Sequence, residues 1–227
     1  VSCDLTHATP ACFISHVKDR DMQEDIAKYY LTENCDIFLG GGLKRFTPNT
    51  RKDKENLIDS LKERGYEIVY NEKELNQAKS DKIAGFFADE HLPLVKDRGD
   101  IEQKFLDKTL EAFSKDTNGF FIMLEGSQID MQAHDNHYDE MVEETLDFDA
   151  CVRKAVEFAN KDGNTLVIVT ADHETGGLTL PAKDNTFKPK YSTFGHTGVP
   201  IIIYSYGVGS EEFEGVMQNN ETGEKLF

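Results

Sequence analysis

The sequence predicts an α/β fold with a mostly parallel central sheet that is flanked by helices on both faces. Apolar runs without strict alternation of polar and apolar residues are typical of strands buried on both faces. These runs alternate along the chain with stretches of helical periodicity, which favours strand–helix–strand units. We therefore expect one α/β domain over residues 1–227.

Six apolar runs are the predicted strands. The first ends in three glycines, and the fifth runs directly into Asp172 and His173. The predicted ranges are 35–42, 66–70, 83–88, 119–126, 164–170 and 199–207. In open α/β sheets, ligands bind beyond the carboxyl ends of the strands. The residues that follow each run are therefore the first candidates for a functional site.

Helical periodicity marks most of the segments between these runs. In the second helical stretch, three apolar residues share one face and Gly65 ends the pattern. The predicted helices begin near Asp21 and cover 50–65, 101–115 and 139–163. The segment 181–198 is rich in proline, lysine and glycine, so we expect an exposed loop there.

The composition excludes several classes of partner. The chain has 42 acidic and 25 basic residues and a formal net charge of −17, and such a surface repels nucleic acids. No apolar run approaches the ~20 residues of a membrane-spanning helix, so no span is expected. The four cysteines form neither a CxxC pair nor a zinc-finger spacing. A small anionic substrate stays compatible with this charge, because metal ions reverse the local sign.

Side chains that commonly ligate metals lie at the ends of three consecutive predicted strands. Asp130 and His134 have the i, i+4 spacing that brings two side chains to one face of a helix. The six candidates are Glu125, Asp130, His134, Asp172, His173 and His196. Each alone is also explained by a helix-face hydrogen bond, a helix cap or a loop histidine, but three strand ends together favour a metal cluster. Mixed Asp and His ligation suits zinc, and Glu with a hydroxyl suits magnesium.

Several motifs resemble those of the alkaline phosphatase family. "THATPA", "EGSQIDMQAH", "TLVIVTADHETGG" and "GHTG" occur in this order, and "CDIFLGGG" and "ERGYEIV" also look like segments of that family. The resemblance covers nearly the whole chain. It implies an alkaline-phosphatase-like fold that is incomplete at the N-terminus, so that the chain is expected to be the C-terminal part of a longer catalytic domain.

The resemblance also implies three metal ions, two zinc and one magnesium. By resemblance, the ligands are Asp130, His134 and His196 for the first zinc, Asp172 and His173 for the second, and Glu125 and Thr9 for the magnesium. His7 stands where some family members have an Asp near the magnesium, so it is expected to lie outside the ligand set. Arg20 matches the arginine that clamps the substrate phosphate, where a guanidinium fork suits two phosphate oxygens.

The reaction implied by the family is hydrolysis of phosphate monoesters through a phosphoserine. In the family, the serine and an aspartate that bridges two metals precede "THATPA", and no serine in this chain matches that motif. We therefore expect an active parent protein and an inactive 227-residue chain. A non-catalytic zinc-binding fragment and a related phosphodiesterase or sulfatase are the alternatives. The family further implies a phosphate monoester or inorganic phosphate as ligand, a homodimer, and a periplasmic or extracellular location.

Overall fold

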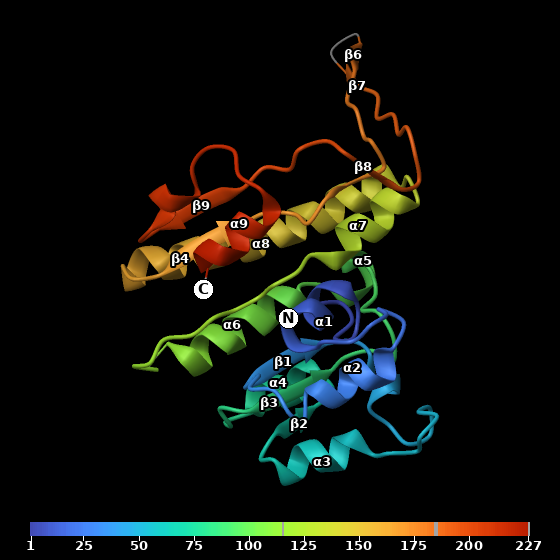
Figure 1. The fold of residues 1–227 in the computed structure, drawn as a ribbon, viewed down its shortest axis with the longest axis vertical. Coiled ribbons are helices and arrows are strands. Elements are labelled where there is room, and N and C mark those ends of the chain that lie inside the picture. Colours follow the sequence, from blue (N-terminus) through green and yellow to red (C-terminus); the bar gives the residue numbers. More distant parts are fainter. Residues whose placement is uncertain (115, 184–185, 227) are drawn as a thin grey trace. The chain divides into compact units, whose positions relative to one another are not determined.

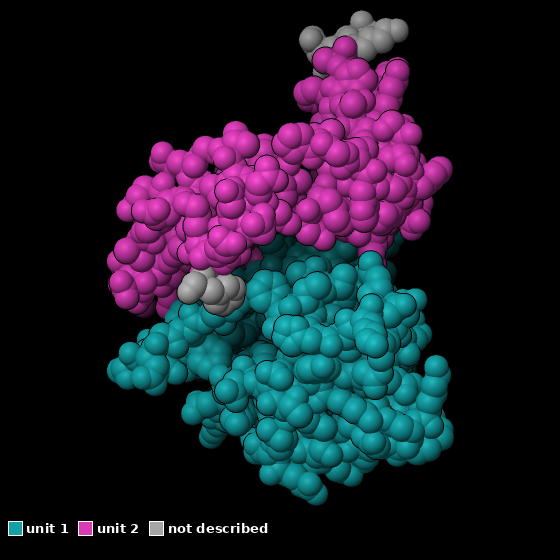
Figure 2. All heavy atoms as spheres, in the orientation of Figure 1, with its two compact units in different colours: residues 1–128, 143–148 teal, residues 129–142, 149–227 magenta. Residues whose placement is uncertain are grey.

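The computed structural model describes residues 1–114, 116–183 and 186–226, and it confirms the α/β class (Figure 1). Lys115 in the predicted helix 101–115, and Asp184 and Asn185 in the predicted loop, lie outside the described residues. The chain divides into two compact units (Figure 2). The first comprises residues 1–128 and 143–148, and the second comprises residues 129–142 and 149–227. A single domain over 1–227 stays a prediction.

The first unit is built on a three-stranded parallel sheet, which confirms three of the predicted strands. The strands are β1 (Ile37–Gly40), β2 (Glu67–Val69) and β3 (Ile83–Phe86), in the order β1-β3-β2. β3 is buried at every position, as expected of the central strand. Phe38, Phe46 and Phe86 are at most 2% exposed, and the ring of Phe86 contacts the rings of the other two. Burial of each such side chain contributes roughly 1.5–3 kcal/mol.

Helices surround this sheet in the first unit. They are α1 (Ala8–Ile14), α2 (Gln23–Tyr29), the 3-10 helix η1 (Leu43–Arg45), α3 (Leu57–Glu63), α4 (Glu72–Gln77), α5 (Val95–Arg98) and α6 (Ile101–Phe113). α3 begins at Leu57 rather than at residue 50, which corrects the predicted start. The side chain of Asn56 accepts a hydrogen bond from the backbone N–H of Asp59 and so caps the helix there.

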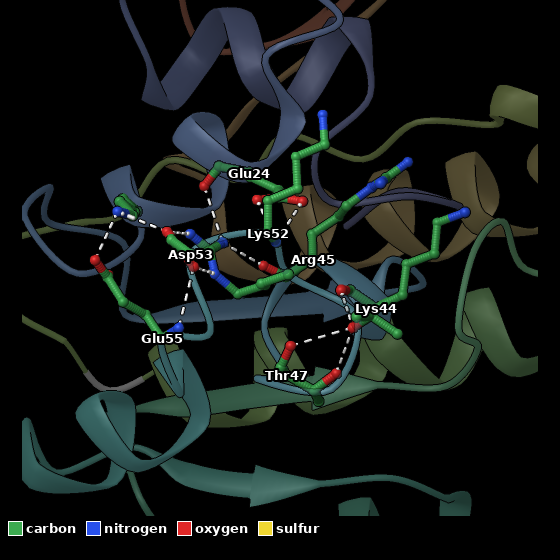
Figure 3. A network of polar contacts seen from close by, with 10 residues as sticks. Glu24, Lys44, Arg45, Thr47, Lys52, Asp53 and Glu55 are labelled. Atoms are coloured by element: carbon green, nitrogen blue, oxygen red, sulfur yellow. Dashed lines mark hydrogen bonds and ion pairs between the residues drawn. The ribbon is translucent and has the colours of Figure 1, made fainter.

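A buried arginine explains why the residues before α3 form a loop. The Arg51 side chain is 0% exposed and makes two hydrogen bonds to the Asp53 carboxylate, of 2.9 and 2.5 Å. It also donates to the backbone carbonyls of Glu24 and Arg45. Figure 3 shows this network together with Lys52, whose side chain points away from it. These contacts hold the loop on α2 and η1 and leave the helix to start after it.

The predicted strand 119–126 is wrong, because no strand is assigned there within the described residues. Two backbone hydrogen bonds join it to Val1: the Val1 ammonium donates to the Met123 carbonyl and the Glu125 N–H donates to the Val1 carbonyl, at 2.8 and 3.0 Å. Two hydrogen bonds to one residue are too few for a strand ladder. The apolar run is therefore extended next to Val1 without forming a strand.

Two helices pass from one unit into the other. α7 (Ser127–His134) and α8 (Tyr138–Asp162) confirm the two helical predictions made for this region. α8 ends at Gly163, whose φ of 73° lies in the left-handed region that favours glycine.

The middle of α8 belongs to the first unit, where buried ion pairs hold it. Arg98, at the end of α5, contacts Glu144 and Asp147 of α8 and Glu102 of α6, at 2.8, 2.8 and 3.3 Å respectively. All four side chains are at most 4% exposed. One guanidinium therefore joins three helices.

The strands of the second unit pair antiparallel in twos. They are β4 (Leu166–Val169) with β9 (Tyr204–Gly207), β5 (Glu174–Thr175) with β8 (His196–Thr197), and β6 (Ala182–Lys183) with β7 (Thr186–Phe187). The unit also contains the 3-10 helix η2 (Ser210–Phe213) and the helix α9 (Asn219–Leu226). The predicted strand 199–207 is correct only from Tyr204 onward. Within the described ranges, every helix falls short of the length and apolar character needed to cross a membrane.

Candidate metal centre

α7 brings Asp130 and His134 together on one face of a helix. The two residues are i and i+4, and the Oδ1 atom of Asp130 lies 3.6 Å from the Nε2 atom of His134. Both side chains are partly exposed, at 41% and 36%. The helical spacing expected from the sequence is thereby confirmed.

β8 supplies the third member of this group. The Nε2 atom of His196 lies 3.2 Å from the Nε2 atom of His134. Asp130, His134 and His196 each offer one ligand atom, and these three atoms lie within 4.8 Å of one another. Among the described residues, this is the group of at least three Asp, Glu, His or Cys side chains whose ligand atoms lie that close together. Tetrahedral zinc with bonds of about 2.0–2.1 Å places its ligand atoms about 3.3 Å apart. The separations of 3.2 and 3.6 Å fit that requirement.

A backbone carbonyl determines which nitrogen of His134 is available. The Nδ1 atom of His134 lies 2.5 Å from the carbonyl oxygen of Phe194, which can only accept a hydrogen bond. Nδ1 therefore carries the proton, and the Nε2 atom keeps a lone pair. Metal-binding histidines commonly donate their second ring N–H to such an acceptor.

Asp172 and His173 form a second pair beside the first group. They follow β4, and the Oδ2 atom of Asp172 lies 3.2 Å from the Nε2 atom of His173. The His173 ring stacks on the His196 ring, with centroids 3.5 Å apart and an interplanar angle of 23°. The second unit therefore brings together all five predicted zinc ligands.

The glycines of "DHETGG" allow the tight turn that follows β5. Gly176 and Gly177 have φ angles of 88° and 60°, a region in which other residues are strained. A Cβ atom on Gly177 would also overlap the hydroxyl of Ser192. The Glu174 carboxylate accepts hydrogen bonds from the N–H of Gly177 and from the hydroxyl of Thr197. This clamp holds β5 against β8, and so fixes His196.

The other predicted site residues, Thr9, Glu125, His7 and Arg20, lie in the first unit. Thr9 is the second residue of α1, and His7 is the residue that precedes this helix. The Glu125 carboxylate accepts a hydrogen bond of 2.5 Å from the hydroxyl of Ser2, which is fully buried. Glu125 is therefore held in place by residue 2 of this chain.

Arg20 lies on the surface beside His7. Its Nη2 atom is 3.1 Å from the Nε2 atom of His7, which accepts the hydrogen bond. Burial, the neighbouring His91 and the Arg20 guanidinium together lower the pKa of His7. A neutral His7 leaves the Arg20 guanidinium with free N–H donors that an anion can engage.

Sequence reasoning missed three groups that hold the candidate ligands: the Thr175 hydroxyl, the Phe194 carbonyl and the Ser2 hydroxyl. Thr175 lies within the "DHETGG" motif, so its position was a usable signal. A backbone carbonyl and a serine more than 120 residues distant from its partner leave no pattern in the sequence.

Comparisons with known proteins point to one family. The family model described as alkaline phosphatase matches residues 1–193. Alkaline phosphatase 3 of Bacillus subtilis (strain 168) is 30% identical, and the alignment covers 99% of this chain and 65% of that protein. The structure of alkaline phosphatase from the Antarctic bacterium TAB5 has a TM-score of 0.92 and 41% identity, and covers 98% of this chain and 68% of that chain.

A variant of the TAB5 enzyme is also similar. In this variant a histidine is replaced by glutamate, and magnesium is bound in the M3 site. Its structure has a TM-score of 0.92 and 40% identity, and covers 98% of this chain and 68% of that chain. This chain thus spans about two thirds of the length of these relatives, 65% and 68%. The family model, the curated relative and the fold agree, and we conclude that the chain belongs to the alkaline phosphatase family.

Proposed function

We propose that the protein is a zinc- and magnesium-dependent phosphate monoester hydrolase that acts through a phosphoserine, and that these 227 residues hold metal ions without turning over substrate by themselves. The observation that carries the proposal is the group formed by Asp130, His134 and His196, whose ligand atoms all lie within 4.8 Å of one another. The pair of Asp172 and His173 beside it supports a second zinc position.

The donor sets fit the proposed ions. Carboxylate oxygens and imidazole nitrogens are ligands of zinc, and the contact of the His134 Nδ1 atom with the Phe194 carbonyl leaves Nε2 as the nitrogen that faces the group. When bound, a pair of zinc ions stabilises the attacking and leaving oxygens of an in-line displacement at phosphorus. The His and Asp side chains would hold the zinc ions in position. The hydrogen bonds of Glu174 keep β8 in place.

Magnesium is proposed at Glu125 and Thr9 in the first unit. Carboxylate and hydroxyl oxygens are the ligands that magnesium prefers. Ser2 fixes the Glu125 carboxylate through their hydrogen bond. His7 offers a nitrogen atom rather than oxygen, so we do not include it among the magnesium ligands. The magnesium in the TAB5 variant supports such a site in a similar protein.

Arg20 is proposed to bind the phosphate group of the substrate. Its side chain is exposed, and its guanidinium donates a hydrogen bond to His7. A planar guanidinium binds two phosphate oxygens at once and balances the charge that develops on them. The ester P–O bond then breaks as the serine oxygen bonds to phosphorus, and water releases inorganic phosphate. No serine of this chain matches the motif of that nucleophile.

Two further statements belong to the same proposal. The family resemblance supports a homodimer and a periplasmic or extracellular location. A zinc-binding fragment without turnover is the expected behaviour of the isolated chain, whereas a phosphodiesterase or sulfatase is less favoured, because Arg20 and the complete "DHETGG" motif match the monoester hydrolases.

The test combines metal content with anion binding. The chain is loaded with zinc and magnesium, freed of unbound metal, and examined by elemental analysis, by equilibrium dialysis with phosphate or sulfate, and for hydrolysis of 4-nitrophenyl phosphate. We expect about two zinc ions for each chain, phosphate bound in preference to sulfate, and hydrolysis at background.

The matched variants are Arg20→Ala and Arg64→Ala, because Arg64 is an exposed arginine of the same unit. Arg20→Ala should retain zinc and bind phosphate about 10- to 100-fold more weakly, the effect of losing hydrogen bonds to a charged group. Arg64→Ala should match the wild type. Absence of zinc, equal binding of sulfate, or full turnover by the wild-type chain would contradict the proposal.

A further inference from the structure

The hydroxyl of Thr175 contacts candidate ligands of both zinc positions. Its Oγ1 atom lies 2.5 Å from the Oδ1 atom of Asp130 and 3.1 Å from the Nδ1 atom of His173. Thr175 is also the cross-strand partner of His196 in the β5–β8 pair. One side chain therefore adjoins ligands from α7, from the end of β4 and from β8.

The direction of these hydrogen bonds follows from counting protons. A threonine hydroxyl has one proton to donate, and an ionised carboxylate can only accept. The Thr175 proton therefore goes to Asp130, as the 2.5 Å contact indicates. Toward His173 the same oxygen can only accept, so the Nδ1 atom of His173 carries the proton. The Nε2 atom of His173, which lies 3.2 Å from the Oδ2 atom of Asp172, is then the nitrogen with the free lone pair.

We propose that Thr175 is a positioning residue shared by the two zinc positions: its hydroxyl orients Asp130 for the first and sets the proton of His173 for the second. This inference rests on the proposed function, because it concerns the same metal ions. The hydroxyl bonds to neither ion and takes no part in the displacement. Its effect is to hold a ligand of each position in the orientation that a bound ion requires.

A purely structural role for this side chain would not need the hydroxyl. A strand position opposite His196 accepts valine as well as threonine, because both are β-branched. Thr179 shows the ordinary behaviour of a threonine in this unit, since its hydroxyl donates to a backbone carbonyl, that of Lys190. The Thr175 hydroxyl instead lies between two candidate ligand side chains. Replacing it with a methyl group keeps the volume and removes both contacts.

The variants for the test are Thr175→Val, Thr175→Ser and, as a matched control, Thr179→Val. Each full 227-residue chain is titrated with zinc against a chromophoric chelator, which gives the affinity of each zinc step. Cobalt is then substituted for zinc, because its visible absorption reports the ligand geometry. Circular dichroism verifies that each variant is folded, and the serine variant restores the hydroxyl if the valine variant folds poorly.

We expect Thr175→Val to weaken both zinc steps by about 10- to 100-fold, the usual effect of losing a group that orients a ligand, and to alter the cobalt spectrum. Thr175→Ser should recover most of the affinity, and Thr179→Val should match the wild type. Wild-type affinity at both steps in Thr175→Val, or a loss confined to one step, would overturn this inference and leave the proposed function standing. A wild-type chain that takes up no zinc would overturn the proposed function and this inference with it.

Discussion

The Nε2 atoms of His134 and His196 lie 3.2 Å apart, although the two residues are separated by 62 positions in the sequence. One histidine comes from the last turn of α7 and the other from β8. Because the Phe194 carbonyl binds the Nδ1–H of His134, the ring nitrogen that faces His196 is an acceptor. A cation between these nitrogens and Asp130 satisfies all three side chains at once.

Removal of this ring should therefore abolish the first zinc position. We expect His134→Ala to weaken the binding of the tightest zinc ion by more than about 100-fold. This loss exceeds the roughly 10- to 100-fold loss expected when a side chain that only orients a ligand is removed. The measurement is zinc titration against a chelator. His137→Ala is the control, since His137 precedes α8 in the same unit and its ring contacts the side chain of Gln132, which is not a candidate ligand. Equal losses in the two variants would show that the effect is not specific to the site.

The nitrogen of His7 should limit magnesium binding in the first unit. An aspartate at this position offers oxygen, which magnesium prefers, and adds one negative charge close to Thr9. We expect His7→Asp to raise the affinity for magnesium about tenfold or more, as measured by titration calorimetry. His16→Asp adds the same charge at an exposed histidine of the same unit. A similar gain in that control would mean that net charge, and not a ligand oxygen, is responsible.

The loop before α3 should depend on Arg51. Replacing Arg51 with methionine keeps much of the side-chain volume but removes the donors to Asp53 and to the carbonyls of Glu24 and Arg45. We expect the free energy of unfolding to fall by about 2–4 kcal/mol, since buried acceptors lose their partner. Denaturant unfolding measures the change. Lys52→Ala is the control, because the side chain of Lys52 is exposed, and it should stay within about 0.5 kcal/mol of the wild type.

The cluster around Arg98 should make stability fall as the pH rises. Burial raises the pKa of Glu102 to about 7, an effect that Arg98 opposes and that the nearby Asp147 and Glu144 reinforce. Its Oε1 atom has no hydrogen-bond partner among the described residues. Between pH 4.5, the ordinary pKa of this group, and about pH 7, the unfolded chain has released the Glu102 proton while the folded chain keeps it. A rise in pH through this range therefore favours unfolding.

Glu102→Gln removes this dependence. We expect the variant to match the wild type near pH 4.5, the ordinary pKa of the group, and to exceed its free energy of unfolding above pH 7 by an amount on the order of 1–3 kcal/mol. Denaturant unfolding at both pH values is the measurement. Glu111→Gln, an exposed carboxylate of the same helix, should show no such dependence. Parallel pH curves for wild type and Glu102→Gln would contradict the assignment.

The sequence was informative where a local pattern determines the structure. The apolar runs identified β1, β2, β3 and β4, and the i, i+4 spacing of Asp130 and His134 placed both on α7. The order of motifs along the chain indicated the alkaline phosphatase family. These features depend on residues close together in the chain, so periodicity and spacing were sufficient.

Features that depend on distant partners were not predictable. The run 119–126 has the composition of a strand, yet the structure assigns no strand there, and Met123 and Glu125 bond to the backbone of Val1. The loop before α3 forms because Arg51 finds acceptors on α2 and η1, which no local propensity encodes. The contacts of Thr175 with Asp130 and His173 likewise require the β5–β8 pairing, which brings the two-residue strands together.

X-ray absorption at the zinc edge of the metal-loaded chain tests the central claim most directly, because it reports the atoms around the bound ion. The account predicts zinc in a first shell of nitrogen and oxygen at about 2.0–2.2 Å, with the imidazole scattering of histidine, and loss of that imidazole signal in His134→Ala. A shell with sulfur at about 2.3 Å would assign the zinc to cysteine and contradict this assignment. A chain that retains no zinc would contradict it as well, because the group of Asp130, His134 and His196 would then hold no ion.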